Sequence, residues 1–296
     1  MKRLFIVMSA MLLTVTSAKA EVKGFEWTVG SDFVSSYLWR GLNIGGLAAQ
    51  PDVMLSYAGI ELEAWANLGL WNNSFKDFSN TNKFNPELDL TLSYSYSLVK
   101  VGVTHQHYFD GSRFFDLKNY DYSAYKAEDY SGDQLEVFAE FDLAEVIEIV
   151  PLKIGWYTFV AGDDKYFITP DKQYISADDL ANVTDDTGYD VKRAFSTYIE
   201  VSYDAALPFN LTLTPTIGIT PWRSMYTNYE GKFAVNNISL KLNWEYEIND
   251  HICLDLYALG SLNTHGLTKD NLIPARADSY SYQQLNGVIG LGLWFF

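Results

Sequence analysis

Carboxylate side chains recur at every second position in several segments of this chain. Glu61 and Glu63 form one such pair, and Glu87 and Asp89 form another. Successive side chains of a β-strand point to opposite faces, so each pair places two carboxylates on one face. Fixed carboxylates that line a narrow water-filled path favour cations. The candidate residues for such a path are Arg40, Glu61, Glu63, Glu87, Asp89, Glu136, Glu140 and Glu200.

Arg40 is the basic member of this set. It lies between Trp39 and Gly41, at the end of a segment with strand-like alternation. An arginine among lumenal acids would pair with them, narrow the path and hold the first strand in register. Local packing beside Trp39 is the alternative interpretation.

Two histidines could also carry chemistry. His105 and His107 lie two positions apart, which would place both imidazoles on one face of a strand and could hold a metal. Their parity is that of Val101, so the pattern predicts that they face lipid near the outer interface. Ser93 and Ser95 have the opposite parity, which separates them from the imidazoles that a serine hydrolase would need. We therefore expect no enzyme active site here.

A third candidate is the aspartate-rich segment between residues 162 and 193, which includes Asp185, Asp186 and Asp190. Carboxylate and carbonyl oxygens are the ligands that calcium prefers, but the spacing matches no EF-hand loop. A solvated acidic loop, able to fold inward and constrict a lumen, is the favoured interpretation. The sequence therefore predicts no resident metal and no cofactor.

The elements that must position these side chains are strands with one polar and one apolar face. The clearest example runs from Glu87 to Tyr96, where polar residues alternate with leucines and then tyrosines. Twelve segments show this period of two. They span residues 26–40, 51–57, 59–71, 86–97, 99–110, 133–143, 151–161, 194–205, 209–220, 233–247, 251–262 and 284–296.

The connections between these segments alternate in length. Residues 58, 98, 144–150, 206–208 and 248–250 make short links, and longer ones separate the remaining strands. A soluble sandwich gives no reason for this alternation, whereas outer-membrane barrels combine short periplasmic turns with long extracellular loops. The pattern predicts an all-β, transmembrane, antiparallel up-and-down β-barrel of about twelve strands.

The start of the chain predicts export. Lys2 and Arg3 precede an apolar run, and Ala18-Lys19-Ala20 matches a signal-peptidase site, so we expect residues 1–20 to be a signal peptide and residues 21–296 to form one barrel domain. Without Lys2, Arg3 and Lys19 the net charge falls from −16 to −19. Such an acidic chain is unsuited to nucleic acid. The single cysteine, Cys253, excludes a disulfide-stapled secreted domain.

Part of the chain resembles a known family. The run from Ser31 to Gly41, followed by Gln50-Pro51-Asp52 and Tyr57-Ala58-Gly59-Ile60, is similar to the opening of the TorF-type porin family. The likeness continues through Glu87-Leu88-Asp89-Leu90 and Val101 to Tyr108. It covers roughly a third of the mature chain, mainly residues 29–110. The resemblance implies a porin-like outer-membrane barrel and names no substrate.

These observations predict a channel in the bacterial outer membrane for passive diffusion of small polar solutes, with a preference for cations. The expected partners are outer-membrane lipid and lipopolysaccharide, small solutes, and the barrel assembly machinery, which would recognise the aromatic C-terminal strand. Two alternatives remain open: a barrel enzyme that acts on lipid, and a structural or adhesive barrel that acts through its extracellular loops. The sequence leaves open whether the lumen is open or plugged, the oligomeric state, and calcium binding by the loop 162–193.

Overall fold

The computed structural model describes residues 24–71, 86–109, 114–115, 117, 133–147, 149–162, 164–168, 190–226, 233–264 and 285–296. The predicted signal peptide at residues 1–20 lies outside these ranges. Among the described residues, no helix is both long and apolar enough to cross a membrane.

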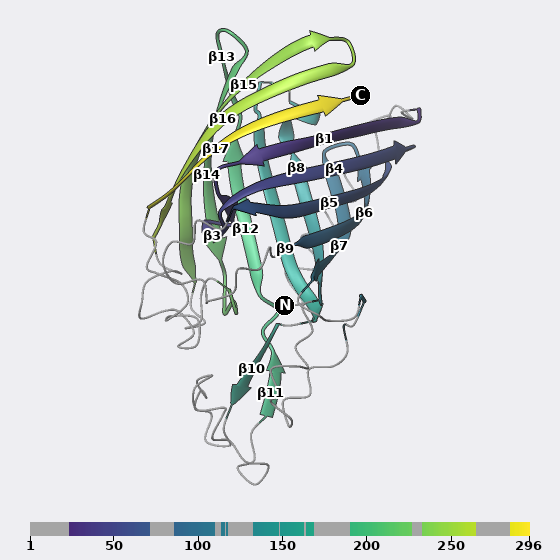
Figure 1. Ribbon diagram of the computed structural model, residues 1–296. Helices are drawn as coiled ribbons and strands as arrows, with labels where there is room; N and C mark the ends of the chain where they lie inside the picture. Colours follow the sequence, from purple (N-terminus) through teal and green to yellow (C-terminus); the bar gives the residue numbers. More distant parts are fainter. Residues whose placement is uncertain are drawn as a thin grey trace.

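Twelve antiparallel strands close into a barrel (Figure 1). The sheet closes because β12 pairs with β9 on one side and with β14 on the other, so the barrel has no open edge. The barrel strands are β1 (Glu26–Val34), β4 (Leu47–Tyr57), β5 (Ile60–Trp71), β6 (Glu87–Tyr96), β7 (Val99–Tyr108), β8 (Asp133–Asp142), β9 (Leu152–Gly162), β12 (Thr197–Tyr203), β14 (Leu211–Thr220), β15 (Ala234–Asn249), β16 (Ile252–Asn263) and β17 (Leu285–Phe295).

Smaller elements accompany the barrel. A short strand, β13 (Ala205–Leu207), extends the sheet beside β14, and a single 3-10 turn, η2 (Leu143–Glu145), joins β8 to β9. Two hairpins stand apart from the main sheet: β2 (Tyr37–Trp39) with β3 (Leu42–Gly45), and β10 (Lys165–Ile168) with β11 (Asp190–Arg193). The β10–β11 hairpin extends from the end of the barrel opposite the C-terminus (Figure 1).

The two faces of the sheet differ in the way that the alternation predicts. Leu62 on β5 and Leu92 on β6 are paired across the strands and remain 53% and 49% exposed on the outer face. Their neighbours Glu63 and Thr91 are also paired, on the inner face. A closed sheet satisfies its backbone groups internally, which is what a spanning structure needs in lipid. The predicted fold class is therefore confirmed.

Tight turns join consecutive strands at the end that carries the C-terminus. Between β4 and β5, Ala58 and Gly59 both have positive φ, of 51° and 85°, which is the backbone of a type I′ hairpin turn. Glycine is needed at the second position because a Cβ there would lie 2.6 Å from the carbonyl oxygen of Ser95. Such turns follow the right-handed twist of the strands and fix their register.

The first strand is shorter than predicted. The alternation predicts a strand over residues 26–40, but β1 ends at Val34 and a bend follows at Ser35 and Ser36. The Ser35 amide donates to the carbonyl oxygen of Ile289, and the Ile289 amide donates to Ser35 Oγ, both at 2.9 Å. These two bonds are the last between this segment and β17, and the β2–β3 hairpin follows them. The prediction was wrong because the hairpin continues the alternating pattern of the strand.

Candidate functional site

The β2–β3 hairpin lies inside the barrel. Arg40 Nη2 donates to Glu136 Oε2 on β8 at 2.8 Å, and Asn286 Nδ2 on β17 donates to the carbonyl oxygen of Gly41 at 3.0 Å. The strands β8 and β17 are six positions apart around the twelve-stranded sheet, hence on opposite sides. Because the hairpin tip touches both sides, it spans the lumen, by which we mean the interior of the barrel.

A tight turn places Arg40 at the tip of this hairpin. Arg40 and Gly41 have φ of 48° and 83°, again the type I′ pattern. A Cβ on Gly41 would collide with Asn237 and Asn263, so only glycine allows the tip to approach β15 and β16. At the base of the hairpin, the ring of Tyr37 packs 5.6 Å from that of Trp65 on β5.

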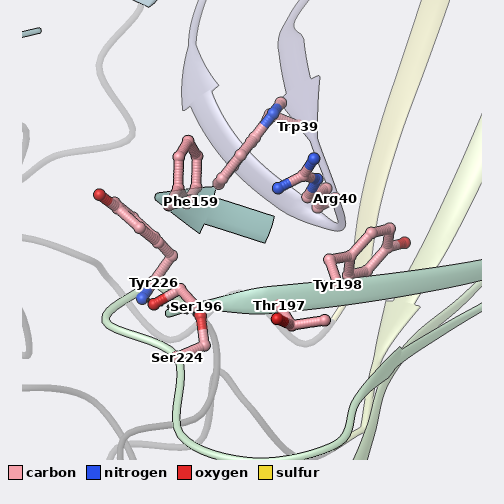
Figure 2. A pocket seen from close by; sticks show the side chains of 8 residues that line it. All are labelled: Trp39, Arg40, Phe159, Ser196, Thr197, Tyr198, Ser224 and Tyr226. Carbon is pink, nitrogen blue, oxygen red and sulfur yellow. Dashed lines mark hydrogen bonds between the residues drawn. The ribbon is translucent and has the colours of Figure 1, made fainter. Parts of the chain in front are cut away.

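Aromatic rings surround the Arg40 guanidinium (Figure 2). The Arg40 Cζ lies 4.6 Å from the ring centroid of Trp39, 4.9 Å from that of Tyr157, 5.1 Å from that of Tyr198 and 5.8 Å from that of Phe159. Arg40 is thus held by cation–π contacts as well as by its ion pair. The pair is desolvated, with side-chain exposures of 12% for Arg40 and 5% for Glu136.

We call the side chains that enclose Arg40 the cage; they are Trp39, Tyr157, Phe159, Tyr198 and Glu136. Two further predicted acids lie beside it. Tyr157 Oη donates to Glu140 Oε1 at 2.7 Å, and Tyr198 Oη approaches Glu200 Oε2 at 3.3 Å and Asn237 Oδ1 at 3.1 Å. Glu140 and Glu200 therefore orient the two tyrosines whose rings contact Arg40. The structure brings together four of the predicted residues: Arg40, Glu136, Glu140 and Glu200.

A small pocket opens beside the hairpin (Figure 2). The ring of Tyr226, which follows β14, meets that of Trp39 edge-on at 5.7 Å and that of Phe159 at 5.1 Å. The residues that line the pocket are Trp39, Arg40, Phe159, Ser196, Thr197, Tyr198, Ser224 and Tyr226. The pocket is therefore bounded by the hairpin on one side and by β9, β12 and the segment after β14 on the other.

The remaining predicted acids lie on the neighbouring strands β5 and β6. Glu87 accepts hydrogen bonds from the hydroxyls of Tyr37 and Tyr108, so it contacts the hairpin. Glu61 pairs with Lys100 and also accepts a bond from Ser93 Oγ at 3.3 Å. The inner-face acids of β5 and β6 form one wall of the lumen, which continues toward the end of the barrel with the short turns.

Glu63 and Asp89 complete the wall, together with an acid that the sequence reasoning missed. Asp52 on β4 lies beside Glu63 on the adjacent strand β5. Asp89 lies on the same inner face, opposite Trp65. The parity of the strand Pro51 to Tyr57 places Asp52 opposite to Val53, Leu55 and Tyr57, and this signal could have identified it.

The four lumenal bases of the described strands and of the described hairpin are each engaged by the protein itself. Lys153 Nζ lies 2.9 Å from Asp204 and 3.7 Å from Asp142, and Lys100 pairs with Glu61. Lys241 Nζ lies 4.4 Å above the ring centroid of Tyr257, and Arg40 is bound to Glu136. Several acids of the lumen therefore have no basic counterpart among the described residues.

The two histidines occupy a setting that the sequence did not predict. Their parity is outward, as expected, but His105 and His107 are 3% and 2% exposed rather than interfacial. Asp133 on β8 binds both, with 3.1 Å between its Oδ2 and His105 Nε2. Phe115 stacks on His105 at 4.0 Å, and Phe114 meets both imidazoles edge-on. Phe114 and Phe115 therefore cover the imidazoles, and no local pattern reports such a contact.

The acidic loop contributes little that can be described. Asp185 and Asp186 lie outside the described residues, and Asp190 begins β11. Within the described ranges, no group of three histidine, cysteine or acidic side chains is placed to hold a metal ion.

No protein-family model and no curated protein matches the chain, so the resemblance to TorF-type porins stays a prediction. Solved structures whose backbone is similar to that of this chain include an outer membrane channel from Pseudomonas putida F1. The match has 11% identity and a TM-score of 0.41, and it covers 94% of this chain and 96% of that one. The CymD monoaromatic hydrocarbon channel matches at 9% identity and a TM-score of 0.39, covering 97% and 92%.

Outer membrane phospholipase A from Escherichia coli also matches, at 11% identity and a TM-score of 0.35, covering 93% of each chain. Identities and TM-scores this low assign no function.

The localisation follows from the architecture itself, because a closed antiparallel barrel with an aliphatic outer face and a charged interior is suited to the outer membrane. The protein is a bacterial outer-membrane β-barrel.

Proposed function

We propose that this barrel is an outer-membrane channel for passive diffusion of small polar solutes, and that it prefers cations. The observation that carries the proposal is the charge of the lumen. Asp52, Glu63 and Asp89 line one wall, while the bases of the lumen are paired with other acids or stacked on a tyrosine. Uncompensated carboxylates along a water path attract cations and repel anions.

The hairpin sets the resting state of this channel. It crosses the lumen near the long-loop end, which we take as extracellular, and it is held there by Arg40 on one side and Gly41 on the other. We therefore expect low conductance from the wild-type protein. A variant in which residues 37–45 are replaced by a short glycine-containing turn should conduct more, because the strands of the barrel remain unchanged.

A second function is favoured by the same hairpin. A lumen that is permanently filled would leave the loops as the functional surface, as in a structural or adhesive barrel. Enzymatic action on lipid, the third alternative, would need a nucleophile in contact with an imidazole. The described contacts of His105 and His107 are with Asp133 and aromatic rings instead.

Planar-bilayer recording tests the proposal. In a potassium chloride gradient, the hairpin-shortened variant should give a reversal potential of the sign that reports cation selectivity. Anion selectivity would overturn the charge argument. Absence of conductance from both proteins, each shown to be folded by heat-modifiable electrophoretic migration, would favour the structural or adhesive function.

A further inference from the structure

The cage around Arg40 belongs mainly to the barrel rather than to the hairpin. Three of its four rings come from barrel strands, namely Tyr157 and Phe159 on β9 and Tyr198 on β12. Its carboxylate, Glu136, is on β8. If the hairpin left the lumen, these four side chains would remain together, because β8, β9 and β12 are adjacent strands of the closed sheet.

Aromatic faces combined with a carboxylate are the chemistry that recognises organic cations. The negative faces of the rings attract a cation within about 6 Å of the centroid. The hydroxyls of Tyr157 and Tyr198 are directed to Glu140 and Glu200, so they present no donor that would repel a positive group. The carboxylate adds a charge-assisted hydrogen bond.

The same region contains acceptors without donors. Arg40 uses Oε2 of Glu136, whereas Oε1 of this buried side chain has no hydrogen-bond partner among the described residues. Oε1 of the buried Gln106 on β7 and Oδ1 of Asp89 on β6 are unpartnered in the same sense. Asp89 lies directly opposite Gln106, and its charged neighbours are the acids Glu87, Glu136 and Glu63 and the base Arg40. The region therefore suits a ligand rich in N–H donors.

A bare metal ion is a poorer fit than an organic cation. The described acids and histidines form no group of three that could converge on a metal. A planar guanidinium has five donors and stacks on aromatic faces, and an ammonium has three donors. Either would match acceptors that are spread over adjacent strands.

The backbone of Arg40 supports a role for its side chain. Its φ of 48° is in the left-handed region, where glycine or asparagine is the usual residue. An arginine occupies this position, and its side chain reaches the cage of the opposite wall. Backbone outliers of this kind cluster at ligand clamps and switch regions.

We infer that Glu136, Tyr157, Phe159 and Tyr198 form a binding site for organic cations of the guanidinium or ammonium class, and that Arg40 is its built-in occupant. The inference rests on the proposed function, since it names the solute class of that channel. A solute of this class competes with Arg40 for the cage. Displacement of Arg40 removes the ion pair that holds the hairpin across the lumen, so binding and opening are coupled.

The test is a titration of purified, detergent-solubilised full-length barrel, with Arg40→Ala as the vacated site. Methylguanidinium is the probe, and N-methylurea, which has a similar shape but no charge, is the control ligand. Isothermal titration calorimetry should show saturable binding of methylguanidinium to Arg40→Ala, at least tenfold weaker binding to the wild type, and no binding of N-methylurea.

Two double variants locate the site. Arg40→Ala with Glu136→Gln should weaken binding at least tenfold, whereas Arg40→Ala with Glu247→Gln should bind like Arg40→Ala, because Glu247 is exposed near the end of β15. Equal affinity of wild type and Arg40→Ala, or affinity that survives Glu136→Gln, would overturn the inference. If Arg40→Ala does not fold, the hairpin-shortened variant supplies the vacated site with the barrel residues unchanged.

Bilayer recordings separate this inference from the proposed function. Methylguanidinium binding without conductance would leave the cation site standing and remove the channel. Cation-selective conductance without binding, or with no increase on adding methylguanidinium to the wild type, would leave the channel standing and remove Arg40 as a competing occupant.

Discussion

Tyr257 on β16 donates a hydrogen bond to Asp32 on β1 across the intervening strand β17, with 3.2 Å between Oη and Oδ2. Two glycines of β17 make room for this link. A Cβ on Gly290 would overlap the ring of Tyr257, and one on Gly292 would lie 2.5 Å from Asp32 Oδ1. At these two positions β17 therefore carries no side chain on its inner face, and β1 and β16 interact through the lumen.

Replacing Gly290 with alanine should destabilise the barrel. The added methyl group displaces the Tyr257 ring and its bond to Asp32, and overpacking of this kind costs about 1–3 kcal/mol. Urea unfolding in phospholipid vesicles measures the loss. Gly260→Ala is the matched control, because a Cβ there meets no atom within 4 Å. Identical unfolding free energies for the two variants would show that β17 tolerates a side chain at position 290.

Adjacent residues of β6 should differ in how much stability the same substitution costs. Leu92 is on the outer face, so Leu92→Arg places a charge in lipid and should cost roughly 2–4 kcal/mol if the site is near the bilayer midplane. Thr91 is on the inner face opposite Glu63, so Thr91→Arg gains an acidic neighbour and should cost much less. Reversible unfolding in lipid compares the two, and a larger loss for Thr91→Arg would reverse the assignment of the faces.

The strand positions were predictable because alternation is a local property of the chain. The segment 86–97 contains β6 (Glu87–Tyr96), and the segment 251–262 differs from β16 (Ile252–Asn263) by one residue at each end. Asp52 could have been assigned to the lumen by the same rule, since it alternates with apolar neighbours.

The site was less predictable because its contacts are tertiary. Arg40 was a candidate from its type and place, but its cage joins β8, β9 and β12, which are about a hundred residues or more away in sequence. The hairpin that carries Arg40 keeps the alternation of a strand, so its turn inward left no signal in that pattern. Phe114 and Phe115, which cover His105, likewise lie outside any periodic segment of the sequence.

The histidine cluster on the outer wall should contribute to stability. Asp133→Leu removes the shared acceptor of His105 and His107 and leaves two buried imidazoles without it, at a cost of roughly 1–3 kcal/mol. Lys153→Met is the comparison, since that lysine is 50% exposed and its pairs with Asp142 and Asp204 should contribute at most about 1 kcal/mol. Urea unfolding of both variants checks the order. A smaller loss for Asp133→Leu would mean that the aromatic cover, rather than the hydrogen bonds, stabilises the buried imidazoles.

Ion preference should depend on the wall formed by β4 and β5. In the hairpin-shortened background, Asp52→Asn with Glu63→Gln removes two neighbouring inner-face acids, and the reversal potential in a potassium chloride gradient should move toward zero. Glu26→Gln with Glu247→Gln removes the same formal charge from exposed positions at strand ends and should change it less. Raising the salt should weaken the preference in every variant, because the screening length falls from about 10 Å at 0.1 M to about 3 Å at 1 M. An equal effect of the two pairs would mean that total charge, rather than the position of the carboxylates along the lumen, governs selectivity.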